Sequence, residues 1–434
     1  MFVAVDKKVQ EHVPIIMYLH YITVWMLSAY LLIDIMSGFF VIQFGVDLKL
    51  SLLYKMPLFV LLMLLISRYQ FKLFILLLFS ILLLLIGPTA ELFRRPIVSF
   101  FAVDFGYVIK ILMPVAVFLY FYSLFKYAPD FTEKWIKIAL WSNFSFLLIN
   151  LGFAALGFGR SSYVLSNDET VGANGFIYAA NELGPTFIVL FGFALYAVWN
   201  NYKKYYLLMS VLTLFCGVLV ATKTAMVAAF LLVFLIPLFS ERNHFFRFTW
   251  LKLKIFFPAI IMIIMLIIFI VDFLEALGLY DKLLWVFSQK GVLGILWSGR
   301  DEYSKNLLDV YLYQSNLFQQ IFGQGSGGVA EHLPVKYSAE VDAVDTFVWF
   351  GFSGLLICFS INFYFITQSA KFLLKKSSCV APCVLLVNLL LLFLSQISGH
   401  VWMSGTLGIS FGLINALLLI EYKNKGEKLC THSL

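Results

Sequence analysis

Polar side chains that could do chemistry stand at the edges of long apolar runs in this 434-residue sequence. An ionisable group in or against such apolar surroundings costs about 2.5–3.5 kcal/mol even on a lenient scale, so each one needs a reason. The set combines cations, carboxylates and one amide. Its members are Arg160, Asn181, Glu182, Lys223, Arg300, Glu340, Asp342 and Asp345. Residues of these types predict a site that holds an anion and accepts a proton.

The three cations of this set suit a diphosphate. An arginine grips phosphate oxygens through a planar fork, and a lysine acts as a point charge. We expect Lys223 and Arg300 to neutralise the diphosphate, with Arg160 assisting. A structural role is the alternative for each: Lys223 could snorkel from a tight corner. The arginines could be surface residues, although a cation at a helix start, where Arg300 is expected, opposes the helix dipole.

The carboxylates cluster in the segment Glu340-Val-Asp342-Ala-Val-Asp345. A carboxylate that takes a proton from an attacking hydroxyl typically contributes about 10²–10⁴-fold to a rate. We assign that role to Glu340 or Asp342, and substrate binding to Asp345, Glu182 and Asn181. Alternatively, the acidic cluster could be a solvated turn, and Asn181 and Glu182 could simply cap a helix.

No metal site and no cofactor are predicted. Two carboxylates at Glu-x-Asp spacing are a weak signal for a divalent ion, and His332 and His400 lack a partner at ligand spacing. The five cysteines show neither a disulfide framework nor a zinc pattern.

These residues must be positioned by membrane-spanning helices. The chain is 62% hydrophobic and 13% charged, against about 45–50% and about 25% in average soluble proteins. This composition excludes a soluble enzyme, a disordered chain and a coiled coil. The net charge of +7 is scattered in twos and threes rather than gathered on one surface, so nucleic acid is not an expected partner.

Apolar runs predict about twelve crossings, because one crossing takes about 20 apolar residues. The first eight runs cover residues 14–33, 52–67, 71–87, 105–125, 135–156, 179–199, 205–220 and 224–239. The last four cover residues 255–274, 346–370, 380–399 and 401–420. We therefore expect an all-α, polytopic integral membrane protein, with the lipid bilayer around a single membrane domain over residues 1–434.

Lysine and arginine in the short loops predict the orientation, since cytoplasmic loops carry an excess of both. Every alternate gap is basic, beginning with Lys7 and Lys8 and ending with the tail after residue 420. Both ends of the chain are therefore expected on the cytoplasmic side (N-in, C-in). The candidate site residues are then all expected on the external side.

One external segment, residues 275–345, is too polar to cross and too long for an idle connector. Within it, Ser298 could cap a helix, Asp301 suits the first turn, and an apolar stripe continues to Ile321. The glycine-rich run Gly323–Gly328 is expected to stop this helix. We predict a partly helical external loop whose helix lies on the outer membrane face and roofs a cavity.

The chain resembles the O-antigen polymerase and ligase superfamily, membrane glycosyltransferases that use polyprenyl-diphosphate-linked glycans outside the inner membrane. The likeness covers roughly residues 160–354 and is carried by short motifs whose order along the spans adds specificity. The motifs are Gly172-Ala-Asn-Gly-Phe176 with Asn181-Glu-Leu-Gly184, Ala221-Thr-Lys-Thr-Ala225, Ser298-Gly-Arg300, and Glu340-Val-Asp-Ala-Val-Asp345 with Phe350-Gly351. The first four apolar runs carry no such motif.

By position, the resemblance implies that Arg300 matches an essential arginine of the family and that Lys223 takes a place often held by a diphosphate-binding arginine. A lysine at position 223 cannot form the bidentate hydrogen bonds with phosphate oxygens that an arginine forms. Ligases of the family typically carry a His-Asn pair about where this chain has Glu340, whereas polymerases more often have a Glu-x-Asp pattern. The resemblance therefore favours a polymerase.

The expected function is polymerisation of undecaprenyl-diphosphate-linked oligosaccharide units, as donor and acceptor, into a surface polysaccharide such as O-antigen or capsule. The resemblance implies a location in the bacterial inner membrane, with a chain-length regulator and a flippase as further partners. The alternatives are an O-antigen ligase and a lipid-linked oligosaccharide transporter. Transporters place their polar residues near the bilayer midplane on broken helices, whereas here these residues gather outside.

Overall fold

A computed structural model of the chain describes residues 14–164, 170–178, 180–241, 280–297, 299–374 and 378–423, together with positions 250, 257 and 275. The structure is 84% helical. Nine helices in the described ranges are long and apolar enough to cross a membrane, and two shorter apolar helices cover residues 381–397 and 407–419. An all-α, multi-pass membrane architecture is thereby confirmed. The crossing predicted at 255–274 lies outside the described residues.

Each of these helices overlaps a predicted apolar run, but several are longer: the first continues to Phe44, against a predicted end at residue 33. The candidate spans are α2 (Pro14–Phe44), α3 (Leu50–Tyr69), α4 (Phe71–Arg94), α5 (Val98–Phe125), α6 (Pro129–Ala155), α7 (Ala180–Asn201), α8 (Tyr206–Val220), α9 (Lys223–Ser240) and α16 (Asp342–Leu374). The shorter helices near the end of the chain are α17 (Ala381–Ile397), α18 (Leu407–Ala416) and α19 (Ile420–Lys423). The last crossing was predicted to begin at residue 401, but the corresponding helix, α18, begins six residues later. Residues 398–406 instead form a connector between α17 and α18.

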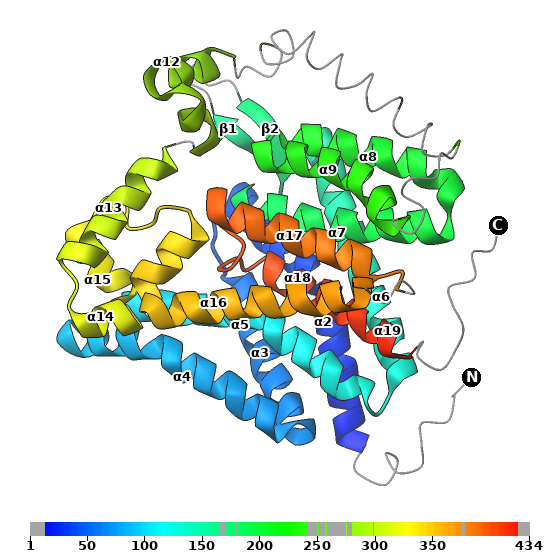
Figure 1. Cartoon of the computed structure of the whole chain (residues 1–434), viewed down its shortest axis with the longest axis horizontal. Helices are drawn as coiled ribbons and strands as arrows, with labels where there is room; N and C mark the ends of the chain where they lie inside the picture. Colours follow the sequence, from blue (N-terminus) through cyan, green and yellow to red (C-terminus); the bar gives the residue numbers. More distant parts are fainter. Residues whose placement is uncertain are drawn as a thin grey trace.

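Helices α5 and α7 form the centre of the bundle (Figure 1). Their most apolar stretches are 72% and 83% buried, against 22% for α4. Helix α7 packs against α6, α8, α9, α17 and α18, while α5 packs against α3, α4 and α18. Lipid tails are as apolar as leucine, so the outer helices can expose leucine and phenylalanine at no cost. The two central helices carry several of the site residues described below.

Buried amides tie the bundle together. Asn143 of α6 accepts from the Leu31 N–H at 3.2 Å and donates to the Leu27 carbonyl at 3.0 Å, so it bridges α6 and α2. Asn388 of α17 and Asn415 of α18 exchange side-chain hydrogen bonds at 2.9 and 3.2 Å. Such pairs orient helices in surroundings that offer no other partner for a polar group.

The segment after α6 forms a two-stranded antiparallel hairpin, β1 (Arg160–Val164) and β2 (Thr170–Gly175), where the sequence predicted only a loop. Asn150 of α6 donates to the Asn174 carbonyl at 2.8 Å and accepts from the Phe176 N–H at 2.8 Å. The buried amide of Asn150 and a hydrogen bond from the Ser162 hydroxyl to the Val220 carbonyl at 2.6 Å fasten the hairpin to the bundle, and the hairpin carries Arg160 at its first position.

The described part of the external insertion contains several short helices instead of one long one. They are α12 (Tyr280–Trp297), α13 (Arg300–Tyr313), α14 (Leu317–Phe322) and α15 (Gly325–His332). Helix α13 begins at Arg300 after Gly299, and Ser298 lies outside the described residues. The predicted helix is split because Asn316 caps a new one, α14, through a capping box with Gln319.

Glycines set the contact between α14 and α16. Gly323 ends α14, as expected, but a further helix begins at Gly325. A Cβ atom on Gly323 would lie 2.0 Å from the Trp349 carbonyl oxygen, and one on Gly351 would lie 2.5 Å from the Gly323 nitrogen. Helix α16 is kinked at Gly351, whose φ is 66°. The kink and the missing side chains let two backbones touch.

Of the insertion helices, α13, α14 and α15 pack on the start of α16, and α14 and α15 also pack on α4, as the left side of Figure 1 shows. Asp104 of α5 accepts from the Ser326 N–H at 2.9 Å and so fixes the start of α15. Arg94 and Arg95, at the end of α4, form ion pairs with Glu331 of α15. The predicted helical roof over a cavity is not seen in the described residues, because these contacts draw the helices to the side.

Candidate functional site

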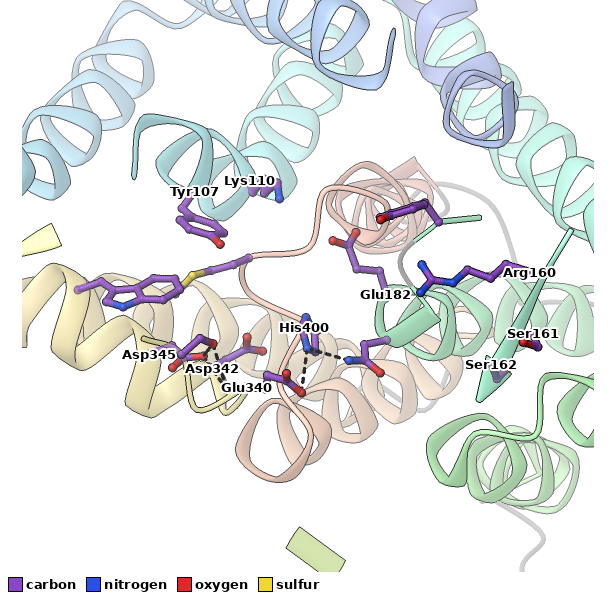
Figure 2. A pocket seen from close by; sticks show the side chains of 15 residues that line it. Tyr107, Lys110, Arg160, Ser161, Ser162, Glu182, Glu340, Asp342, Asp345 and His400 are labelled. Atoms are coloured by element: carbon purple, nitrogen blue, oxygen red, sulfur yellow. Dashed lines mark hydrogen bonds and ion pairs between the residues drawn. The ribbon is translucent and has the colours of Figure 1, made fainter. Parts of the chain in front are cut away.

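A polar cavity of about 400 Å³ lies where α5, α7 and α16 meet the hairpin and the 398–406 connector (Figure 2). Six of the eight residues nominated from the sequence line it. They are Arg160, Asn181, Glu182, Glu340, Asp342 and Asp345. Tyr107, Lys110, Tyr178, Trp349 and His400 line it too. The fold thus brings widely separated stretches of the chain to one place.

The other two nominated residues stand outside the lining. Arg300 donates from Nη2 to Glu340 Oε2 at 3.1 Å, so it acts on the cavity through that carboxylate. Lys223 is the first residue of α9, at a corner where Thr222 Oγ1 accepts from the Ala225 N–H at 3.2 Å. Lys223 and Arg300 were expected to bind one diphosphate together, but neither lines this cavity. Lys223 begins a capped helix, and Arg300 binds the carboxylate of Glu340.

Glu340 is the carboxylate that gathers cations. Besides Arg300, it pairs with Lys336 at 3.1 Å and with His400 at 3.8 Å, measured from Nε2 to Oε2. The interaction with His400 and the positive charges of Lys336 and Arg300 hold the pKa of Glu340 well below its usual range, against the opposing effect of burial. Glu340 is therefore ionised whenever these partners are in place.

His400 is the site residue that sequence reasoning set aside for want of a neighbour. Its Nε2 lies 3.2 Å from Asn181 Nδ2 and faces Glu340 (Figure 2). Burial lowers the pKa of His400, but Glu340, Asp342 and Glu182 together outweigh burial, and the pKa lies above its ordinary value. A protonated Nε2 donates toward Glu340, and an unprotonated one accepts from Asn181. Sequence spacing held no signal for this residue, because its partners come from other helices.

Two carboxylates hold the 398–406 connector. Asp342 Oδ2 accepts from the N–H groups of Val401 at 2.8 Å and Trp402 at 3.0 Å. Glu182 Oε2 accepts from the Thr406 N–H at 2.8 Å and from the Ser404 hydroxyl at 2.8 Å. Both groups therefore fix the backbone that presents His400.

Asp345 fixes the segment that presents Glu340. Its carboxylate accepts from the Ala339 N–H at 2.6 Å, the Glu340 N–H at 3.0 Å and the Ser338 hydroxyl at 2.8 Å. Of the four acids, Glu340 forms ion pairs with cations, whereas Asp342, Asp345 and Glu182 anchor loops through hydrogen bonds, and Glu182 also interacts electrostatically with Lys110.

Lys110 and Arg160 are the cations that line the cavity itself. The Lys110 ammonium lies 5.2 Å from the centre of the Tyr107 ring, and the Arg160 guanidinium lies 5.1 Å from the centre of the Tyr178 ring. Among the described residues, neither forms an ion pair with a carboxylate within 4.0 Å. Arg160 therefore remains available to an anion, whereas the charge of Lys110 also interacts electrostatically with the buried Glu182 carboxylate. The sequence did hold a signal for Lys110, since a lysine inside a spanning helix is a functional candidate by default.

Aromatic rings supply flat walls beside the charges. Tyr107 and Trp349 stack with ring centres 4.9 Å apart, and Tyr178 is 56% exposed. Rings with an apolar face and a polar edge suit a ligand that is itself polar at its rim. In the described ranges, no group of three or more histidine, cysteine or acidic residues is arranged to hold a metal ion.

Comparisons with protein-family models, with curated proteins and with solved structures find no match for this chain. The chemistry of the cavity is therefore inferred from its residues and their geometry.

Proposed function

We propose that this protein is a membrane glycosyltransferase that polymerises polyprenyl-diphosphate-linked oligosaccharide units into a surface polysaccharide. The observation that carries the proposal is one polar cavity lined by two cations that form no carboxylate ion pair within 4.0 Å in the described structure, and by an acid–histidine pair. The position of its lining residues at the starts of α7 and α16 suits a reaction at the outer face of the bacterial inner membrane. The family resemblance of the motifs adds to this support.

In the proposed reaction, the bond between C1 of the donor glycan and its diphosphate oxygen breaks, and a bond forms between C1 and an acceptor hydroxyl oxygen. The bonding electrons leave with the lipid diphosphate. Arg160 and Lys110 offset the charge that develops there, the arginine through two nitrogens and the lysine through one. A diphosphate stabilised in this way leaves without protonation.

The hydroxyl proton passes to the Glu340–His400 pair, which titrates as a unit. Glu340 alone is a weak base because its pKa is low. The pKa of His400 is raised above its ordinary value by the neighbouring carboxylates, so His400 is the stronger base of the pair. Arg300 and Lys336 then act as positioning residues that hold Glu340 in place.

Transport is the weaker alternative. A transporter would use a broken helix to bind substrate near the middle of the membrane. The kink in α16 at Gly351 instead accommodates the backbone of α14, from Ile321 to Gly323. The polar cavity lies toward one end of the bundle, beside the hairpin and the connector.

The proposal is tested by returning variants to cells that lack the gene and analysing their glycolipids. We expect Arg160→Ala and Glu340→Gln each to reduce polymer formation about 10²–10³-fold, the usual cost of removing one group that stabilises transition-state charge. Glu331→Gln is the matched control: it alters a carboxylate that also pairs with two arginines but lies outside the cavity. It should leave polymer length unchanged.

The product in deletion cells separates the rival functions. Accumulation of single repeat units on the lipid carrier at the outer face supports the proposed polymerase. Full-length polymer still joined to its lipid would identify a ligase, and units trapped on the cytoplasmic face would identify a flippase. Wild-type polymer from both Arg160→Ala and Glu340→Gln would overturn the proposed chemistry.

A further inference from the structure

A second cavity lies directly beside the first. It measures about 280 Å³ and is bounded by α3, α5 and the stretch between α2 and α3. Lys110 lines both cavities. The connector also contributes to both, Met403 to the first and Ser404 with Gly405 to the second. One lysine and a thin loop therefore form the boundary between a polar chamber and its neighbour.

The second cavity is largely apolar and reaches the lipid-facing surface. Leu52, Met56, Ile109 and Met113 form its walls. Leu52 is 48% exposed, and α3 buries only 39% of its most apolar stretch, so this wall faces the bilayer. The chamber thus runs from the surrounding lipid to the ammonium of Lys110.

The other charges of this cavity are already neutralised. Lys55 pairs with the buried Asp34 at 2.6 Å, and Asp34 also accepts from the Ser51 hydroxyl at 2.6 Å. Lys49 pairs with Asp47 at the exposed rim. Lys110 is therefore the lysine of this lining that has no carboxylate ion pair among the described residues.

We propose that the second cavity binds the isoprenoid chain of the lipid carrier, with Lys110 contacting the phosphate nearest to the lipid. This inference rests on the proposed function and deepens it. An amphiphile with an apolar tail and an anionic head matches an apolar chamber that ends in one cation. A head group that continues into a glycan would pass Lys110 and enter the polar cavity. The N-terminal spans, which carry no recognisable motif, would then form the binding site for the isoprenoid chain, which we call the lipid seat.

Gly106 offers a way to plug this chamber without disturbing the fold. It lines the cavity, and a Cβ atom built on it would meet no atom within 4 Å. Leucine at this position should fill the space that the isoprenoid chain needs. Gly152 of α6 is the matched control, because a Cβ there also meets nothing within 4 Å and the residue lines neither cavity.

The test uses the full-length protein in nanodiscs of phosphatidylethanolamine and phosphatidylglycerol, with a diazirine-bearing undecaprenyl phosphate as probe. We expect light-driven labelling on peptides of α3 and α5. Gly106→Leu should reduce the labelling at least about tenfold and Lys110→Met should weaken it, while Gly152→Leu should match the wild type, all with monodisperse elution as a check of folding. Excess unlabelled undecaprenyl phosphate should compete, and added phosphatidylglycerol should not.

Equal labelling of Gly106→Leu and wild type, labelling confined to other helices, or equal competition by phosphatidylglycerol would each overturn the inference. Polymer assays in cells separate this failure from that of the proposed function. If Arg160→Ala abolishes polymer while Gly106→Leu leaves both labelling and polymer intact, the function stands and the lipid seat fails. If labelling behaves as expected but deletion cells still make full-length polymer, the seat stands and the polymerase assignment fails.

Discussion

Glu340 and His400 face each other in unusual backbone conformations, with φ of 58° and 59°. A left-handed conformation costs a residue with a side chain about 1–2 kcal/mol, and such strain concentrates at functional sites. Gly399 precedes His400 with φ of 60°, and a Cβ there would lie 2.5 Å from the Glu340 carbonyl oxygen. The segments that carry Glu340 and His400 thus pack closely, and the ion pair between these residues helps to maintain their strained backbone conformations.

The ion pair predicts a pH-dependent stability. The pKa of His400 is raised, so its contribution is complete below the ordinary histidine value of about 6.5 and is lost as pH rises through the folded value. The pKa of Glu340 is lowered, so its contribution is present above the ordinary glutamate value of about 4.3 and is lost as pH falls through the folded value. The pair should therefore stabilise the protein most between these two ordinary values.

Melting temperatures of the wild type and His400→Gln in detergent, measured from about pH 5 to about pH 9, check this expectation. The difference between the two proteins should be largest below about pH 6.5 and shrink at higher pH. A gap that stays constant over the whole range would show that the histidine charge does not contribute.

At the scale of elements, the kinked helix α16 and the short helix α14 depend on glycine for their contact. Gly351 has φ of 66° and close backbone neighbours from α14. The connector before α16 carries Glu340, and Arg300 at the start of α13 binds that carboxylate. A shift of α14 would therefore move α16 or α13 and so change the positions of Glu340 and Arg300.

Gly351→Ala should destabilise the protein more than Gly291→Ala. Gly291 of α12 has nearly the same φ, 64°, but a Cβ there meets nothing within 4 Å. Both changes introduce backbone strain of about 1–3 kcal/mol, and overpacking at Gly351 adds about 1–3 kcal/mol. Thermal unfolding followed by size-exclusion fluorescence measures the two losses. Equal melting temperatures would mean that α14 yields freely.

At the scale of the whole molecule, the cavity residues of α7 and the basic residues beside that helix lie at its opposite ends. Asn181 and Glu182 stand at the start of α7, while Lys203 and Lys204 follow its end. The excess of basic residues in alternate loops predicts that the end with Lys203 and Lys204 is cytoplasmic. The cavity would then open away from the cytosol, as the proposed reaction requires.

Two cysteine variants, one at each end of α7, test this orientation. Tyr178 and Tyr202 flank the helix and are 56% and 61% exposed, so both sites can react. A membrane-impermeant maleimide should label Tyr178→Cys in intact spheroplasts, over the background of the unmodified protein. Tyr202→Cys should react only after lysis. The reverse pattern would place the cavity on the cytoplasmic side and remove the proposed reaction from this protein.

Most of the helices could be predicted from the sequence, because a long apolar run can satisfy its backbone hydrogen bonds in lipid only as a helix. The hairpin of Arg160 could not, since its strands are short, polar and fastened by Asn150 of α6. The split of the insertion helix depends on a local cap at Asn316, a signal that was present but outweighed by the apolar stripe.

The types of residue in the site were determined by the sequence alone, because charges beside apolar runs are costly wherever the chain goes. Only the tertiary structure decided their roles. Glu340 and Asp342 are two residues apart and chemically alike, yet one meets cations and the other binds a connector about 60 positions further on. Lys110 became a site residue only when α5 packed beside α18 and its connector. Such roles depend on which distant backbone lies opposite a side chain, and that is a property of the packed bundle.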